Sequence, residues 1–88
     1  MVAIGTNSKG ERKEFEITSE GILYCDNNEL TELILPEGVK HVWCTNNLLT
    51  ELIIPSGVKE VSCSNNLLTD LILHEGVETV YCTNNLLT

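Results

Sequence analysis

The chain has 88 residues, of which 42% are apolar and 20% are charged, and its formal net charge is −8. This length allows one small domain with a modest core. Five basic residues among thirteen acidic ones argue against binding to nucleic acid or to an anionic membrane surface, because both depend on basic contacts with phosphate. The sequence also has no apolar run of the roughly 18 residues that a membrane helix needs.

Residues 1–19 are predicted to form an N-terminal hairpin. Residues 2–4 and the alternating segment 14–18 are typical of β-strands, and residues 7–10 (Asn-Ser-Lys-Gly) are typical of a turn. We expect the hairpin to cap the segment that follows, with Phe15 and Ile17 as the covering side chains. The same residues lack the apolar stretch of a secretory signal, which favours a cytoplasmic location.

Residues 20–88 are built from four copies of one repeat, the last of them incomplete. The second, third and fourth copies are residues 38–56, 57–75 and 76–88, and residues 21–37 are a shortened first copy. Four cysteines mark the same position in every copy and are spaced 19 residues apart. A period of this length is the signature of a solenoid, in which each copy forms one coil and packs only against its neighbours.

Each copy fits the pattern L-x-x-L-x-L-x-x-N/C-x-L. In the second copy the pattern positions are Val39, Val42, Cys44, Asn47 and Leu49. The chain therefore resembles the leucine-rich-repeat proteins, and in particular the short-repeat bacterial kind, which pair N-x-L with a return segment similar to TELILP and TELIIP here. Its repeat is slightly shorter than theirs. The resemblance implies a right-handed solenoid of short parallel strands with a concave binding face.

The repeat length also predicts the shape of one coil. A strand through Val42 and Cys44 should point both side chains inward, and Leu49, Leu52 and Ile54 should line the core from the return leg. Nineteen residues leave no room for a helix, so the return leg should be extended or 3₁₀. The fold class is therefore a β-rich solenoid with a non-helical convex side.

The repeated cysteines and asparagines are interpreted as structural ladders. A zinc site would need four sulfurs at about 2.3 Å from one ion, whereas a column with one cysteine per coil spreads them over roughly 14 Å. Disulfides between neighbouring coils are within reach but would distort the strands, so we expect buried, free thiols. The second asparagine of each pair should satisfy backbone groups inside the coil. These ladders are Cys25, Cys44, Cys63, Cys82 and Asn28, Asn47, Asn66, Asn85.

No residues with the pattern of a catalytic, metal or cofactor site are found in the sequence. The two histidines, His41 and His74, have no periodic serine or cysteine partner, and Glu32, Glu51 and Asp70 share one repeat position that is expected to be solvated. The sequence contains no glycine-rich phosphate loop. We therefore expect a protein that is not an enzyme.

Protein recognition through the concave strand face is the function that the pattern favours. The outward strand positions vary while the framework repeats, and they carry three of the aromatic residues, a type enriched in binding sites. The alternative interpretation is that aromatic residues simply suit strands. The predicted binding face consists of Tyr24, His41, Trp43, Glu60, Ser62, Thr79 and Tyr81.

The second hypothesis is a structural or self-associating array, including a fragment of a longer leucine-rich-repeat protein. An apolar stripe should face outward on the return leg, although twisting could bury it instead. The given sequence stops inside a copy, so the fourth strand should have an open edge that pairs two chains end to end. The predicted self-association residues are Ile34, Ile53, Ile72, Val80, Leu86 and Leu87.

Overall fold

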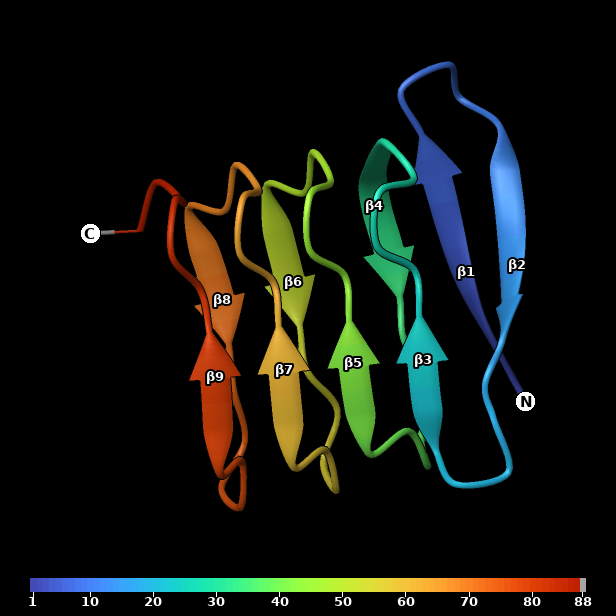
Figure 1. Ribbon diagram of the computed structural model, residues 1–88, viewed down its shortest axis with the longest axis vertical. Helices are drawn as coiled ribbons and strands as arrows, with labels where there is room; N and C mark the ends of the chain where they lie inside the picture. Colours follow the sequence, from blue (N-terminus) through green and yellow to red (C-terminus); the bar gives the residue numbers. More distant parts are fainter. Residues whose placement is uncertain (88) are drawn as a thin grey trace.

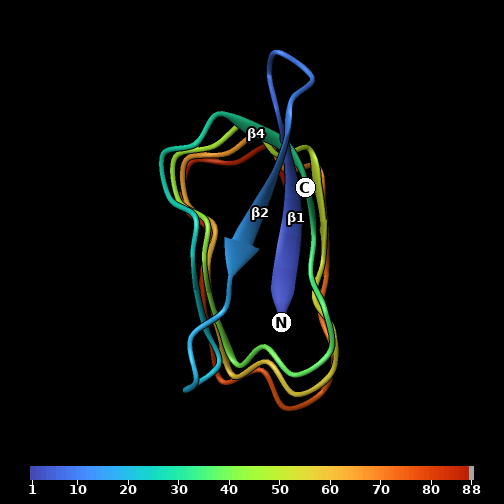
Figure 2. The ribbon, with the colours of Figure 1, turned by 90° about the vertical axis from the view of Figure 1, so that its right-hand side faces the viewer.

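The computed structural model describes residues 1–87, and within them it consists of nine β-strands and no helix (Figure 1). The repeats stack as parallel coils and make a β-solenoid of about three turns. Seen along the stack, successive coils largely superimpose (Figure 2). The prediction of an all-strand solenoid with a non-helical return leg is thus confirmed.

One side of the solenoid, called here the front wall, is a continuous four-stranded parallel sheet. Its strands are β3 (Ile22–Tyr24), β5 (His41–Trp43), β7 (Glu60–Ser62) and β9 (Thr79–Tyr81), in that spatial order. Equivalent residues of neighbouring copies are paired, for example Val42 with Val61. Each copy therefore contributes one strand, and the 19-residue period becomes one strand spacing.

The opposite side, called here the back wall, is formed by the return legs. Strands β6 (Glu51–Ile53) and β8 (Asp70–Ile72) pair in parallel, again with equivalent residues side by side. The return leg of the first copy, β4 (Leu30–Ile34), belongs to a different sheet. The back wall is therefore interrupted between the first and second copies.

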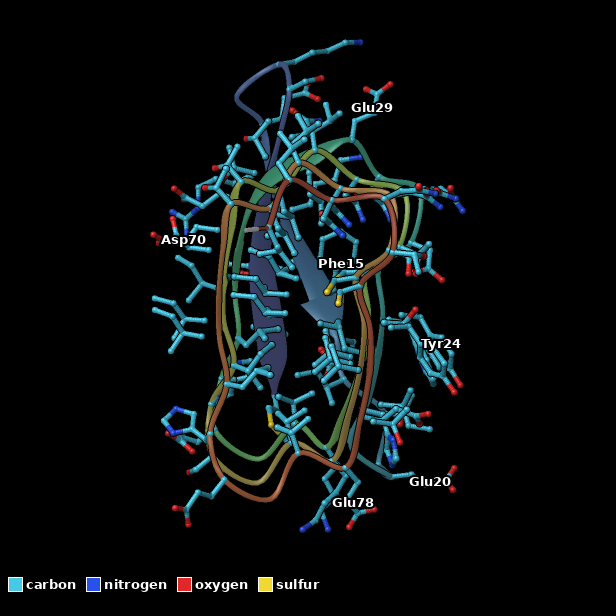
Figure 3. The ribbon with its side chains drawn as sticks, turned by 90° about the vertical axis from the view of Figure 1, so that its left-hand side faces the viewer. Phe15, Glu20, Tyr24, Glu29, Asp70 and Glu78 are labelled. Carbon is cyan, nitrogen blue, oxygen red and sulfur yellow. The ribbon has the colours of Figure 1, made fainter. Side chains whose placement is uncertain are left out.

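The N-terminal hairpin explains this interruption. Strands β1 (Val2–Asn7) and β2 (Arg12–Glu16) are antiparallel, and the other edge of β1 pairs with β4, also antiparallel. The hairpin covers the first coil with Ala3 and Ile17, which are buried, and with Phe15, which packs against the core. Seen along the stack, Phe15 lies inside the outline of the coils (Figure 3). The pairing of β1 with β4 was not predicted from the sequence.

Two local features turn the first return leg toward β1. Glu29 has a positive φ of 55°, whereas Leu48 at the equivalent position of the second copy does not have a positive φ. The Glu29 carbonyl accepts a hydrogen bond from the Ser8 amide at 2.9 Å. Gly5 on β1 lies so close to β4 that an added Cβ would come within 2.8 Å of Leu30 Cδ2. Glycine thus allows the two strands to pack closely.

The core is a set of columns, one residue from each copy. Val42 and Cys44 from the front wall meet Leu49, Leu52 and Ile54 from the return leg, and each of these side chains is at most 1% exposed. In the fourth copy the equivalent positions are only half-buried, among them Val77, Val80 and Cys82. The expectation that all four cysteines are fully buried is therefore wrong for Cys82, because no further coil covers it within residues 1–87.

The double asparagines make the turn that follows each front strand. The first of each pair has a left-handed conformation, with φ between 57° and 59° for Asn27, Asn46, Asn65 and Asn84, which asparagine tolerates better than most residues. In the second, third and fourth copies the second asparagine connects two copies through its side-chain amide. Asn28 is an exception to the predicted ladder, because its side chain bonds only to the Asp26 carbonyl of its own copy. This division of roles accounts for the pair of asparagines in the second, third and fourth copies.

Asn47 shows how the second asparagine joins two copies. Its Oδ1 accepts hydrogen bonds from the amides of Asn28 and Leu30, both at 3.0 Å, and its Nδ2 donates to the carbonyls of Cys25 and Cys44, both at 3.0 Å. Asn66 and Asn85 repeat three of these four bonds one and two copies later. These bonds satisfy backbone groups inside a tight turn, where an unpaired group is costly.

Candidate functional site

The front wall places four predicted binding residues in one column. Tyr24 is paired with Trp43, Trp43 with Ser62, and Ser62 with Tyr81. The two tyrosines are 62% and 52% exposed, and Trp43 is half-buried. In Figure 3, Tyr24 projects outside the outline of the coils, on the side opposite Asp70. Ser62 is the one small side chain in this column, between two aromatic neighbours.

The other three predicted residues form a second column beside the first. His41, Glu60 and Thr79 are paired in register on β5, β7 and β9, and all three are half-buried. His41 Nδ1 lies 3.3 Å from Glu60 Oε1, and the two side chains are 36% and 29% exposed. A partly exposed pair of this kind orients both side chains but contributes little stability.

Hydrogen bonds of two side chains, Ser62 and Asp26, fix residues next to the aromatic column. The hydroxyls of Thr45 and Ser62 lie 2.8 Å apart, and the Thr45 amide donates to Asp26 Oδ1 at 2.6 Å. Ser62 is therefore held down beside Trp43 instead of reaching into solvent. Trp43 and Tyr81, on either side of Ser62, are about two strand spacings, roughly 10 Å, apart.

Strand spacing is the same on both walls for the second and third copies. They are one strand apart in front, as shown by the paired β5 and β7, and one strand apart behind, as shown by the paired β6 and β8. The first copy is not paired with the second on the back wall. Concavity of the front wall stays a prediction.

The predicted self-association residues also lie at the surface. Ile34, Ile53 and Ile72 are 58%, 54% and 49% exposed on the back wall, so the return leg does not twist to bury them. Leu86 and Leu87 are exposed as well, and Val80 is half-buried. The structure thus places two separate sets of exposed apolar residues on the back wall and in the fourth copy.

The cysteines are free and lie in a column behind the front wall. Burial raises the pKa of the Cys25 thiol to about 12, with the Asp26 charge as a smaller cause, and it raises the pKa of the Cys63 thiol to about 11. Burial likewise raises the pKa of Cys44 well above its usual value. Since the thiolate is the reactive form, burial disfavours nucleophilic reactions of these three thiols at neutral pH.

Within residues 1–87, no group of three or more histidine, cysteine, aspartate or glutamate side chains gathers closely enough to hold a metal ion. Over the same part of the chain, no helix is long and apolar enough to cross a membrane.

Comparison of the chain with models of known protein families, with curated proteins and with solved structures gives no match.

One feature of the surface was missed by reasoning from the sequence. Between β4 and β6, where the back wall is interrupted, lies an open groove of about 690 Å³. Its lining includes Ile34 and Ile53, which the sequence singled out for exposure, together with three glutamates. The one signal for it in the sequence is Glu29, which stands where the later copies have Leu48, Leu67 and Leu86.

Proposed function

We propose that this chain is a leucine-rich-repeat module that binds a protein partner through the outward face of the front wall. Support for the repeat class comes from the pattern L-x-x-L-x-L-x-x-N/C-x-L combined with stacked parallel strands and asparagines that join neighbouring copies. Its strand-like back wall is a departure from repeats that carry a helix on that side.

The observation that carries the function is the exposed aromatic column of Tyr24, Trp43 and Tyr81. A monomeric solenoid of this size has no structural need for two tyrosines that are more than half exposed, and aromatic side chains provide much of the energy at protein interfaces. Ser62 is a small side chain between Trp43 and Tyr81, so the aromatic column is not continuous. His41 and Glu60 add a polar margin beside it.

Affinity capture with the wild type and with Tyr24→Ser/Tyr81→Ser tests this proposal. Both tyrosines are exposed, so the double variant should keep its fold by circular dichroism while losing a partner that the wild type captures. Trp43→Ala should lose it too, and Leu67→Ala, an exposed apolar residue away from the front wall, should retain it. A partner that survives all the front-wall substitutions would contradict the proposal.

Self-association is the second candidate, favoured by the exposed stripe of Ile34, Ile53 and Ile72. Apolar residues gathered on one face commonly mark an interface. Light scattering over a concentration series, with Val80→Lys beside the wild type, separates the two candidates. A module that binds a different partner remains monomeric throughout, whereas an associating array grows with concentration.

A further inference from the structure

The groove on the back wall lies between two strand edges that have no partner. Strand β4 is paired with β1 on one edge, and β6 is paired with β8 on one edge. Within residues 1–87, no hydrogen bond joins β4 to β6. By contrast, the third copy is bonded to the second through Thr69 N to Thr50 O at 3.0 Å and Ile54 N to Ile72 O at 2.9 Å. The Leu30 carbonyl at the start of β4 accepts a hydrogen bond from the Leu48 amide at 2.7 Å. Beyond that point, the facing edges of β4 and β6 present free backbone donors and acceptors.

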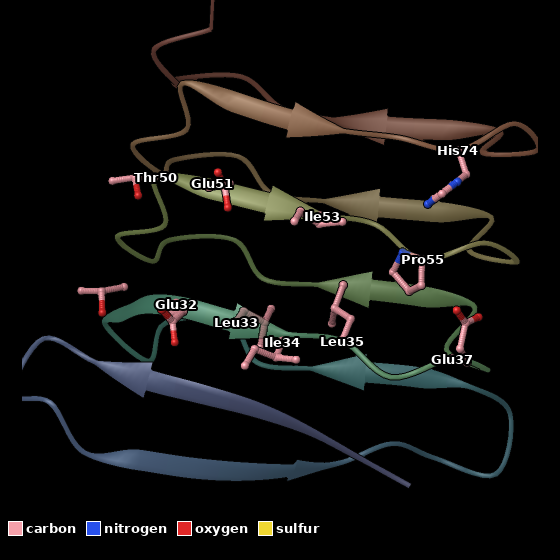
Figure 4. Close-up of a pocket in the computed structure, with 11 residues that line it drawn as sticks. Glu32, Leu33, Ile34, Leu35, Glu37, Thr50, Glu51, Ile53, Pro55 and His74 are labelled. Atoms are coloured by element: carbon pink, nitrogen blue, oxygen red, sulfur yellow. The ribbon is translucent and has the colours of Figure 1, made fainter.

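The side chains along the groove are arranged in zones (Figure 4). Glu32 and Glu51 lie across from each other at one end, and Ile34 and Ile53 lie in the middle. The far end has Glu37 and His74 beside an apolar pair, Leu35 and Pro55. The lining has three carboxylates and no lysine or arginine.

These features define the chemistry of an occupant. Free strand edges accept an extended backbone, as in β-strand addition, and exposed isoleucines accept an aliphatic side chain. Glutamates at both ends favour basic residues on either side of that side chain, and the net charge of −8 attracts such a segment from a distance. The groove follows the five residues of β4, a length that matches an extended segment of about six or seven residues.

We propose that the groove between β4 and β6 binds an extended peptide segment of a partner protein, with aliphatic residues flanked by lysine or arginine. The aliphatic side chain rests on Ile34 and Ile53, and the basic side chains reach the glutamates at the two ends. The peptide backbone lies along the groove and hydrogen-bonds to free backbone groups of one strand edge. This site lies on the wall opposite the aromatic column and does not depend on it.

The repeat provides matched controls for this proposal. Asp70 and Ile72 are the equivalents of Glu51 and Ile53 one copy later, they are also exposed, and neither lines the groove. Glu51→Gln and Asp70→Asn change the net charge equally. A difference between them therefore reports on the groove and not on general electrostatic attraction.

Fluorescence anisotropy with a labelled peptide, Thr-Lys-Val-Ile-Val-Thr-Lys, tests the proposal. We expect saturable one-to-one binding that weakens at least tenfold for Glu32→Gln/Glu51→Gln and for Ile53→Ala. Asp70→Asn, Ile72→Ala and Trp43→Ala should each change the affinity less than twofold. A peptide with glutamate in place of both lysines should not bind, and proline at its central position, which removes a backbone donor, should weaken binding.

Three results would overturn the proposal. They are the absence of saturable binding, equal losses in the groove variants and their controls, and concentration-dependent dimers in which a second copy of the chain occupies the groove and excludes the peptide. Because Trp43→Ala leaves the groove intact, loss of front-wall binding and loss of peptide binding are separate outcomes.

Discussion

The front and back walls are built from the same repeats, yet only the front wall is continuous. In front, the amides of Cys25, Cys44 and Cys63 each donate to the carbonyl of the next copy at 2.8 Å. Behind, the second and third copies are paired, but the first copy pairs with the hairpin instead. The difference shows that the sequence of a repeat determines its own conformation. Which of its strand edges are hydrogen-bonded depends on the segment that lies next to it.

The largest expected effect comes from placing a charge inside the front wall. Cys63 is fully buried, and a carboxylate at this position would have no partner. Burying such a charge costs more than the free energy of unfolding of a small domain, which is about 5–15 kcal/mol. Cys63→Asp should therefore be unfolded by circular dichroism. Ser62→Asp, one residue earlier and facing out, should still unfold cooperatively on heating. If the two variants behaved alike, the assignment of inward and outward positions would fail.

A smaller effect is expected from breaking the joint between the first two copies. Asn47 is 5% exposed and makes four buried or half-buried hydrogen bonds to the backbone at 3.0 Å. Asn47→Ala leaves those groups unpaired and should lower the free energy of unfolding by about 3 kcal/mol. Asn28 donates a side-chain hydrogen bond only to the Asp26 carbonyl, so Asn28→Ala should cost less than about 1 kcal/mol. Urea denaturation measures both.

Alkaline pH should lower the free energy of unfolding through the column of buried thiols behind the front wall. Within residues 1–87, the back wall has no such column. The pKa of Cys63 rises from 9.0 to about 11 on folding, so its contribution is complete below pH 9 and is lost as the pH rises toward 11. Over that interval the unfolded chain releases a proton that the folded chain keeps, and stability falls by about 1.4 kcal/mol per pH unit. Cys63→Ala should reduce this slope by that amount; an unchanged slope would contradict the burial of the thiol.

Most of the fold follows from the repeat itself. The period predicts the coil, the alternation predicts that Cys44 points in and Trp43 points out, and the length of the repeat excludes a helix. The partner of β4 could not be predicted, because segments 31–35 and 50–54 are almost identical. They differ only at the last position, which is leucine in the first segment and isoleucine in the second. Both segments satisfy the same alternation, whether the neighbouring strand is parallel or antiparallel.

The candidate sites divide in the same way. The aromatic column could be named from the sequence because it depends only on position within a copy. The groove could not, since it arises where one copy meets a segment outside the repeat.

Amide hydrogen exchange tests most directly the claim that the back wall is open between the first two copies. The amide of Ile54 is bonded to the third copy, while the amide of Leu35, its equivalent in the first copy, has no backbone acceptor within residues 1–87. We predict that Leu35 exchanges at least about tenfold faster than Ile54, and that the groove-binding peptide slows Leu35 alone. Equal protection of the two amides without peptide would show that the back wall is closed there and that the groove does not exist.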